Sequence, residues 1–342
     1  MGVRAFITGM SGTAIGSDEA SFLREARPWG LILFKRNIES PTQVAAMTAQ
    51  FREILGWNAP VLVDQEGGRV QRLGPPHWSA YPAGAAFAAL YVADPARGLE
   101  AARLGGRLMA EDLVAVGIDV DCVPVADVPV AGSDRVIGDR AFGDTPDQVA
   151  ALAGAQAEGI MAAGVLPVVK HLPGHGRATA DSHLKLPVVE TDRATLEATD
   201  FAAFRPLSRL PLGMTAHVVF SAVDAVQPAT TSAIMIRDVI RGSIGFEGLL
   251  MSDDISMGAL SGALAERCSA ALAAGCDLVL HCNGKLDEMR EVAATAPLLA
   301  GASAARADRA LALRQRRNDI DLAAARAHFA DLIKQPAAGA TV

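Results

Sequence analysis

The segment from Lys170 to His183 holds the densest group of side chains in the chain that can carry out chemistry. Its sequence, KHLPGHGRATADSH, contains three histidines, a lysine, an arginine and an aspartate among glycines and a proline. Asp181 and His183 are two positions apart, so the carboxylate can orient the imidazole and stabilise its protonated form. A histidine held in this way donates and accepts protons near neutral pH. We therefore expect proton transfer at His183, and a structural role for His175, which lies between two glycines.

A second candidate is Asp253, which follows the apolar run Leu249–Met251 and Ser252. A carboxylate at the end of a buried strand can attack an anomeric carbon, stabilise an oxocarbenium-like transition state or bind a metal ion. Successive side chains of a strand point to opposite faces, so Asp253 and Asp254 point in different directions. We expect one of the two to reach a substrate and the other to bond backbone groups or cap the next helix.

Eight short apolar runs alternate with amphipathic stretches along the chain. This alternation is typical of parallel strands that are buried on both faces and connected by helices. The runs are Ala5–Ile7, Gly30–Phe34, Val61–Val63, Ile118–Val125, Val165–Val169, Leu212–His217, Leu249–Met251 and Cys276–Leu280. Ser40 and Thr145 each precede a proline and have a glutamine three positions on, which predicts helix starts. Met257–Ala273 is predicted to form the helix between the last two strands.

The eight strand–helix repeats predict an α/β fold, a single (β/α)8 barrel, in preference to an open doubly wound sheet. No G-x-G-x-x-G follows the first run, so we expect no dinucleotide cofactor. We assign residues 1–334, with closing helices after residue 285, to one catalytic domain, and residues 335–342 to a disordered tail. Such barrels carry their chemistry at the carboxyl ends of the strands. Polar residues end six runs: Asp64, Asp127, Lys170-His171, His217, Asp253 and His281.

The composition excludes several classes of protein. The 342 residues are 51% hydrophobic and 20% charged, with a net charge of −7, which is neither the composition of a disordered chain nor that of a typical nucleic-acid binder. The four cysteines form no C-x-x-C pair, so we expect four reduced, mostly buried thiols. No apolar run reaches the ~18 residues of a membrane span, and the first ten residues lack a signal-peptide core. We expect a cytoplasmic monomer with no membrane or nucleic-acid partner.

Four blocks of the sequence resemble glycoside hydrolase family 3, and most closely its cytoplasmic single-domain β-N-acetylglucosaminidases. They occur in the family's order and are residues 63–72 (VDQEGGRVQR), residues 138–143 (GDRAFG), the Lys170–His183 segment, and residues 245–248 (GFEG) leading to Ser252-Asp253-Asp254. The resemblance implies a retaining, exo-acting enzyme that needs neither a metal nor another cofactor. The implied substrate is a carbohydrate with a terminal β-linked N-acetylglucosamine, attached to 1,6-anhydro-N-acetylmuramic acid and its peptides in peptidoglycan recycling.

The resemblance also implies a role for each matching residue. Asp253 matches the nucleophile, and Asp181 and His183 match a dyad whose histidine serves first as general acid and then as general base. Asp64 matches the carboxylate that binds hydroxyls of the terminal sugar, which selects for cleavage at the non-reducing end. The remaining substrate-binding residues are Arg72, Arg140, Lys170 and His171.

Several alternatives remain open at this point. Within the family, the enzyme could be a phosphorylase, in which phosphate replaces water as the acceptor, or a β-glucosidase. In another class, the histidine-rich segment together with Asp64, His217, Asp253 and His281 could form the centre of a metal-dependent barrel hydrolase. A sugar-binding barrel without enzymatic activity is a further alternative.

Overall fold

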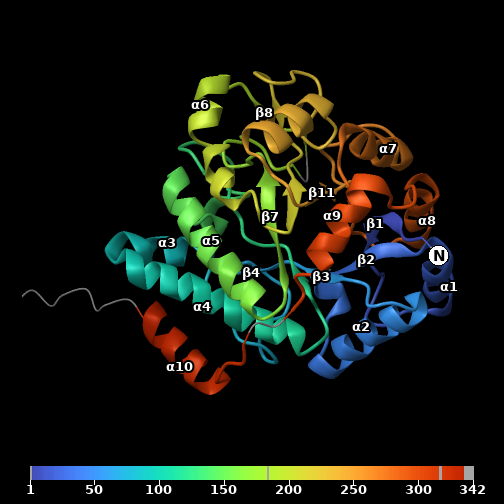
Figure 1. Ribbon diagram of the computed structural model, residues 1–342, viewed down its shortest axis with the longest axis horizontal. Helices are drawn as coiled ribbons and strands as arrows, with labels where there is room; N and C mark the ends of the chain where they lie inside the picture. The colour runs from blue at the N-terminus through green and yellow to red at the C-terminus, as the bar shows by residue number, and fades with distance from the viewer. Residues whose placement is uncertain (1, 183–184, 316–317, 335–342) are drawn as a thin grey trace, which may run out of the picture.

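The computed structural model describes residues 2–182, 185–315 and 318–334 (Figure 1). Within them, eight parallel strands close into a barrel in the order β1, β12, β11, β9, β7, β6, β3 and β2. Their bounds are β1 (Arg4–Thr8), β2 (Pro28–Leu33), β3 (Val61–Val63), β6 (Val120–Asp121), β7 (Leu166–Leu172), β9 (Leu212–Thr215), β11 (Leu249–Asp254) and β12 (Leu278–His281). Each strand overlaps one of the eight predicted runs, so the prediction of a (β/α)8 barrel is confirmed.

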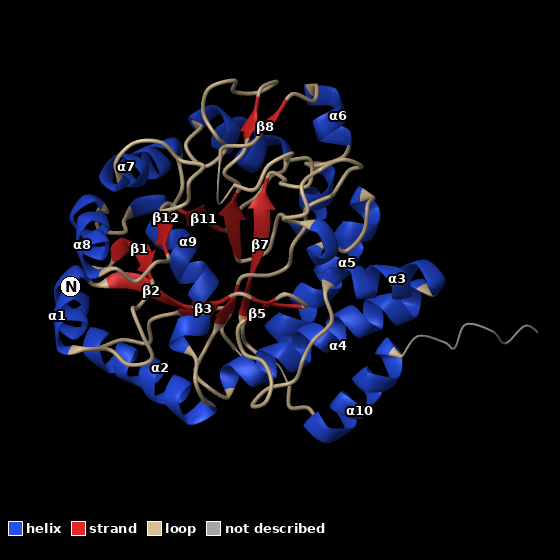
Figure 2. Ribbon diagram, turned by 180° about the vertical axis from the view of Figure 1, so that it is seen from behind, coloured by secondary structure: helices blue, strands red, loops and turns tan. Residues whose placement is uncertain are grey.

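Helices surround the barrel, as Figure 2 shows from behind. The α-helices are α1 (Ser17–Ala26), α2 (Pro41–Leu55), α3 (Gly84–Ala93), α4 (Pro95–Val114), α5 (Pro146–Ala162), α6 (Arg193–Ala198), α7 (Leu264–Ala274), α8 (Leu286–Thr295), α9 (Gly301–Leu311) and α10 (Leu322–Ile333). A π-helical segment covers Met235–Ser243, and 3-10 turns cover Lys35–Asn37, Gly138–Arg140 and Ala202–Leu207. None of the helices in the described part of the chain combines the length and the apolar character that a bilayer span requires.

Two small sheets lie outside the barrel. β4 (Gln65–Gly67) and β5 (Val70–Gln71) form an antiparallel pair directly after β3, and β8 (Val188–Val189) pairs in parallel with β10 (Val219–Phe220). The β4–β5 pair carries the chain through the 63–72 block, and several residues of this block line the pocket described below.

The predicted helix starts are only partly confirmed. The Ser40 hydroxyl accepts a hydrogen bond from the backbone N–H of Gln43 at the start of α2, at 3.3 Å, as expected of an N-cap. Thr145 precedes α5 in the expected place, but its side chain makes no capping bond.

The prediction of a helix over Met257–Ala273 is wrong in its first seven residues. Helix α7 begins only at Leu264, and residues 257–263 form a loop. Gly262 has φ +89°, a left-handed conformation that glycine adopts without strain and that interrupts a helix. Met257 from this loop lines the mouth of the barrel, so the loop belongs to the site described below.

The core has two layers, one inside the barrel and one between the strands and the helices. Alternate residues of a strand belong to different layers. Ile7 and Ile32 lie in the layer inside the barrel, whereas Phe6 and Leu31 lie in the layer between the strands and the helices. All four cysteines are buried and unbridged, as predicted. The division into a catalytic domain of residues 1–334 and a tail remains a prediction, because residues 335–342 lie outside the described residues.

Helices α4 and α5 come into close backbone contact at Gly159. A Cβ atom built on Gly159 would lie 1.9 Å from the carbonyl oxygen of Arg103, a backbone atom that cannot move aside without shifting the helix. We expect Gly159→Ala to lower the free energy of unfolding, measured in urea, by about 1–3 kcal/mol. The control is Gly154→Ala in the same helix, where the nearest atom is a methyl of Leu207 at 3.6 Å and alanine should be neutral or stabilising. Equal destabilisation by both variants would contradict this explanation.

Candidate active site

A pocket of about 520 Å³ opens at the carboxyl ends of the barrel strands. Most of the predicted site residues line it: Asp64, Arg72, Arg140, Lys170, His171, Asp181 and Asp253. The remaining one, His183, lies outside the described residues. The pocket walls come from segments that are far apart in the sequence, and the closed barrel brings them together at one end.

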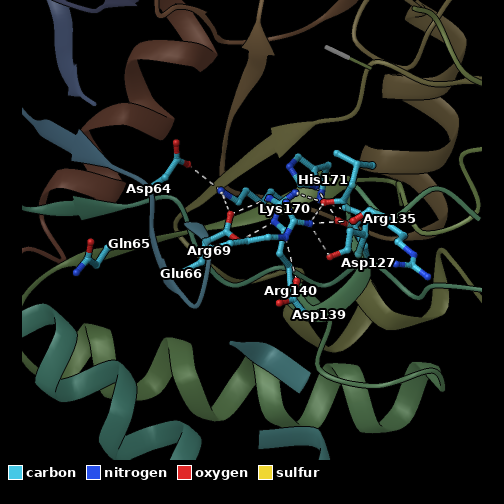
Figure 3. A network of polar contacts seen from close by, with 12 residues as sticks. Asp64, Gln65, Glu66, Arg69, Asp127, Arg135, Asp139, Arg140, Lys170 and His171 are labelled. Carbon is cyan, nitrogen blue, oxygen red and sulfur yellow. Dashed lines mark hydrogen bonds and ion pairs between the residues drawn. The ribbon is translucent and has the colours of Figure 1, made fainter. Parts of the chain in front are cut away.

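Lys170 lies at the centre of a buried group of charges in this pocket (Figure 3). Its Nζ is 2.8 Å from Oδ1 of Asp64 and 2.7 Å from Oε1 of Glu66. Arg72 donates from Nη2 to the other oxygen of Asp64 at 3.0 Å. Arg140 donates to both oxygens of Glu66, each at 2.7 Å, in the bidentate geometry that a guanidinium favours. This charge cluster therefore consists of two carboxylates and three cations, all with hydrogen-bonded partners.

The cluster fixes the protonation states of its members. Burial by itself would raise the pKa of Glu66, but Lys170 and Arg140 outweigh it and lower that pKa to about 2. The pKa of Asp64 is likewise held well below its ordinary value, because Lys170 and Arg72 outweigh the effect of burial. Burial would lower the pKa of Lys170, but the two carboxylates raise it above its ordinary value. At neutral pH the pocket therefore offers both charged acceptors and charged donors, which suits a ligand rich in hydroxyl groups.

Sequence reasoning assigned no role to Glu66, although it pairs with two of the predicted binding residues. A signal was available: Glu66 is two positions after Asp64, and residues two apart in an extended segment point to the same side. Phe34 was missed as well. Its ring lies under the guanidinium of Arg72, 5.5 Å from ring centroid to Cζ, and Arg36 lies 4.9 Å from the same centroid. These contacts restrict where the Arg72 side chain can lie.

His171 is oriented by Asp127, a residue that follows the fourth predicted run. Nδ1 of His171 lies 2.7 Å from Oδ2 of the fully buried Asp127. Burial would raise the pKa of Asp127, but His171 outweighs it and the pKa is lowered. Because Nδ1 of His171 bonds Asp127, a ligand in the pocket would contact the other ring nitrogen, Nε2. The side chain is 7% exposed and lines the pocket.

Asp253 lies at the end of β11 and lines the pocket. Its Oδ1 accepts a hydrogen bond from the backbone N–H of Asp254 at 2.7 Å. Burial would raise the pKa of Asp253, but His217, His171 and this hydrogen bond outweigh it, so the pKa lies below its ordinary value. The carboxylate is therefore ionised at neutral pH, which is the state that a nucleophile needs.

Asp254 has the other role that was expected for the pair. Its carboxylate accepts hydrogen bonds from the backbone N–H of Ser256 and of Cys282, at 3.0 and 3.2 Å, and from the Ser256 hydroxyl at 2.6 Å. Asp254 thus bonds the backbone, as expected of one of the two aspartates, but Asp253 also accepts a backbone hydrogen bond and both residues line the pocket, so the division of roles between them stays a prediction. The carbonyl oxygen of Asp254 also accepts a hydrogen bond from His217 Nε2 at 3.0 Å, which fixes His217 beneath the end of β11.

His175 has local partners, as its position between glycines led us to expect. Its side chain is 3% exposed, its backbone N–H donates to Oδ1 of Asp127 at 2.6 Å, and its Nε2 lies 3.0 Å from Oγ of Ser182. Ser182 and Asp181 both line the pocket. The carboxyl-terminal part of the Lys170–His183 segment therefore reaches the site, at least as far as Ser182.

The described part of the chain does not offer the metal ligands that a metal-dependent barrel hydrolase would need. Across residues 2–182, 185–315 and 318–334, no three His, Cys, Asp or Glu side chains are arranged to hold a metal ion. Two of the histidines considered for such a centre have other partners. His217 bonds Thr230 Oγ1 through Nδ1 at 2.7 Å, and His281 faces Glu288 at 3.4 Å.

Comparison with known proteins places the chain in a family. Residues 7–312 match the N-terminal domain of glycosyl hydrolase family 3. The β-hexosaminidase of Alkalilimnicola ehrlichii is 44% identical over 279 residues, which cover 80% of this chain and 79% of that protein. The β-hexosaminidase of Methylococcus capsulatus is 42% identical over 276 residues, with 80% of each chain covered.

Solved structures agree with this. NagZ from Neisseria gonorrhoeae, in complex with N-trifluoroacetyl-D-glucosamine, superimposes with a TM-score of 0.87 at 32% identity, covering 98% of this chain and 99% of that one. A family 3 β-N-acetylglucosaminidase from Paenibacillus has a TM-score of 0.80 at 29% identity, covering 98% of this chain and 63% of the other. The chain is therefore a member of glycoside hydrolase family 3 and groups with its β-hexosaminidases.

Proposed function

We propose that this enzyme, a β-N-acetylhexosaminidase by its family, is a retaining exo-β-N-acetylglucosaminidase that works through a covalent glycosyl-aspartate intermediate. The observation that carries the proposal is the ionised carboxylate of Asp253, which shares one pocket with the charge cluster of Asp64, Glu66, Arg72, Arg140 and Lys170. A nucleophile and a set of hydroxyl-binding groups at one barrel mouth are two of the parts that retaining glycoside cleavage requires, and a general acid is the third.

The reaction proceeds in two displacements. In the first, a carboxylate oxygen of Asp253 forms a bond to the anomeric carbon as the glycosidic bond breaks, and His183, oriented by Asp181, protonates the departing oxygen. In the second, His183 takes a proton from water, the water oxygen attacks the anomeric carbon, and the bond to Asp253 breaks. Two inversions give net retention of configuration. A histidine, with an ordinary pKa of ~6.5, can serve in both directions near neutral pH.

The charge cluster binds the terminal sugar. The oxygens of Asp64 accept hydrogen bonds from sugar hydroxyls, and Lys170, Arg72, Arg140 and His171 donate to them. A pocket that surrounds the hydroxyls of one sugar accepts only a chain end, which is the physical basis of exo action. The complex of the Neisseria structure with N-trifluoroacetyl-D-glucosamine supports an N-acetylglucosamine unit as the ligand.

For the natural substrate we propose N-acetylglucosamine linked to 1,6-anhydro-N-acetylmuramic acid and its peptides, hydrolysed in the cytoplasm by a monomer during cell-wall recycling. Release of N-acetylglucosamine from this disaccharide by the purified enzyme tests the substrate. If the enzyme hydrolysed a synthetic aryl β-N-acetylglucosaminide but released no N-acetylglucosamine from this disaccharide, the proposed natural substrate would be wrong.

Trapping with a 2-fluoro glycosyl substrate, followed by peptide mapping, tests the reaction class and the nucleophile together. The fluorine slows the second displacement more than the first, provided that the substrate has an activated leaving group, so the glycosyl-enzyme accumulates. We expect the label on Asp253. A label on Asp254 would move the nucleophile by one residue, and an enzyme that remains unlabelled and active would contradict covalent catalysis.

Assays with and without phosphate separate hydrolysis from phosphorolysis. We expect the same rate of turnover of an aryl β-N-acetylglucosaminide in both, with free N-acetylglucosamine as the product. Formation of a glycosyl phosphate would instead identify a phosphorylase. The corresponding aryl β-glucoside, measured alongside, tests the requirement for the N-acetyl group.

His183→Ala should slow substrates with poor leaving groups most. Loss of a general acid typically costs about 10²–10⁴-fold, and an activated aryl group needs little protonation as it departs. We therefore expect a large fall in kcat/KM for the disaccharide. For dinitrophenyl β-N-acetylglucosaminide, an activated aryl substrate, we expect a much smaller fall. His328→Ala is the control, because His328 is exposed and pairs with Glu100 away from the pocket. Equal losses on both substrates would show that His183 is not the general acid.

A further inference from the structure

We infer that His175 is a positioning residue that anchors Ser182 and thereby holds the adjacent Asp181 at the pocket. The inference rests on the proposed function, in which Asp181 orients the general acid, and it gives a specific task to a buried histidine that the mechanism does not otherwise use. The bond between His175 Nε2 and Ser182 Oγ, at 3.0 Å, is the contact that carries it.

Ser182 is held from two sides. Besides the bond from its hydroxyl to His175, its carbonyl oxygen accepts a hydrogen bond from the backbone N–H of Ala259 at 3.1 Å. Ser182 is only 3% exposed, whereas the preceding residue, Asp181, is more open. Ala259 belongs to the loop that follows the proposed nucleophile Asp253. Ser182 therefore connects the two loops on which the two halves of the chemistry depend.

His175 is itself rigidly placed. Its backbone N–H donates to Asp127, the same carboxylate that orients the ring of His171. The two imidazoles meet edge to face, with centroids 5.8 Å apart. Burial, and to a lesser degree His171, lowers the pKa of His175 to about 4, so its ring is neutral at physiological pH. A neutral ring can share a hydrogen bond with a serine hydroxyl without placing a further charge in the interior.

The first part of the segment is fixed by other contacts, which makes Ser182 the next point of attachment. Gly176 packs so closely on the backbone of Val128 that a Cβ would lie 2.0 Å from its carbonyl oxygen. The carbonyl of Ala178 accepts a hydrogen bond from Asp134 N–H at 2.8 Å. Beyond Ala178 the exposed Thr179 is followed by the buried Ala180, and Ser182, which is also buried, bonds His175 and Ala259. Loss of the Ser182 anchor should therefore loosen the backbone that carries Asp181 without unfolding the segment that precedes it.

Three variants separate positioning from direct proton transfer by His175. His175→Gln keeps a hydrogen-bonding group near the place of Nε2 but cannot exchange protons near neutral pH. His175→Leu fills a similar volume without such a group, and Ser182→Ala removes only the partner hydroxyl. His328→Ala serves as the control for replacing a histidine elsewhere. Circular dichroism and urea unfolding establish that each variant is folded.

The first measurement is amide hydrogen exchange of the full chain, which needs no catalytic activity. We expect exchange in a peptide spanning residues 178–182, and at the amide of Ala259, to rise by about tenfold in His175→Leu and Ser182→Ala, which is the effect of losing one hydrogen bond. His175→Gln should stay close to the unchanged protein. If the unchanged protein and the three variants His175→Gln, His175→Leu and Ser182→Ala exchanged at the same rate, the proposed anchoring of Ser182 by His175 would be wrong, whatever the enzyme's substrate.

The second measurement is the dependence of rate on the leaving group. His175→Leu and Ser182→Ala should each lower kcat for the disaccharide by about tenfold, with little change in KM and a smaller loss on the dinitrophenyl glycoside. The double variant should be no slower than either single one, because both remove the same bond. If His175→Gln were as slow as His175→Leu, or if the two losses added, positioning through Ser182 would be wrong. If the unchanged enzyme cleaved no β-N-acetylglucosaminide, the proposed function would fail and hydrogen exchange alone would decide the anchor.

Discussion

Asp253→Ala is expected to lower kcat for an aryl β-N-acetylglucosaminide by a factor on the order of 10⁵ to 10⁶, the size of loss seen when an enzymatic nucleophile is removed. Asp253 is ionised in the pocket and has one backbone hydrogen bond, so its carboxylate keeps acceptor capacity for an anomeric carbon. Alanine offers neither the covalent route nor a charge to stabilise the oxocarbenium-like transition state. Steady-state kinetics with the purified variant measures the loss.

Asp254→Asn is the matched control for this variant. Asp254 is the adjacent carboxylate, and its oxygens accept hydrogen bonds from Ser256 and Cys282, most of which an amide can also make. We expect a loss far smaller than that of Asp253→Ala. Azide should partly restore turnover of an activated substrate by Asp253→Ala and give the α-glycosyl azide, because the small anion attacks from the side that the carboxylate leaves. Comparable losses in the two variants, or a β-azide product, would contradict the assignment of the nucleophile.

Glu66→Gln is expected to lower the free energy of unfolding at pH 7 by about 3–5 kcal/mol, the cost of breaking a buried ion pair by removing one partner. Glu66 is 5% exposed at its side chain and shares its two oxygens between Arg140 and Lys170. With an amide in its place, three cations remain beside the single carboxylate of Asp64. The measurement is equilibrium unfolding in urea.

Glu158→Gln gives the control for removing the same charge from a surface pair. Glu158 is 64% exposed at its side chain and pairs with Arg103 at 2.8 Å. Exposed pairs of this kind contribute only about 0–1 kcal/mol, so the variant should be nearly as stable as the unchanged protein. If Glu66→Gln and Glu158→Gln lowered the free energy of unfolding equally, the buried charge cluster would stabilise the fold no more than a surface ion pair does.

The stabilisation by Glu66 should also depend on pH in a defined direction. Its pKa is lowered in the folded protein to about 2, from an ordinary value of 4.5, chiefly because Lys170 and Arg140 outweigh the effect of burial. A carboxyl group whose pKa is depressed by folding stabilises the fold fully above its unfolded pKa and loses that effect as the pH falls towards its folded pKa. The stability difference between the unchanged protein and Glu66→Gln should therefore narrow between pH 4.5 and 2. A constant difference across this window would contradict the pKa shift.

The sequence by itself determined the architecture and located the strand that ends in the proposed nucleophile, Asp253. Apolar runs such as Val61–Val63 and Leu249–Met251 are long enough only for buried strands, and their alternation with amphipathic stretches leaves few topologies. The polar residues that end the runs, Asp64, Lys170 and Asp253 among them, could be located because strand ends in such barrels share one face. These inferences depend on the periodicity of apolar residues and on the order of the elements along the chain, and both can be read directly from the sequence.

Only the tertiary structure decided which side chains meet. Lys170 bonds Asp64 across 106 positions of sequence. Glu66 has two cationic partners that are also distant along the chain: Lys170 on β7 and Arg140 in the 3-10 turn Gly138–Arg140. The loop of residues 257–263, predicted as helix, instead lines the pocket with Met257 and contacts Ser182 through Ala259. The physical reason is that hydrogen bonds and ion pairs act over a few ångströms. Their partners are therefore set by the closure of the barrel, whereas periodicity along the chain sets only the elements that close it.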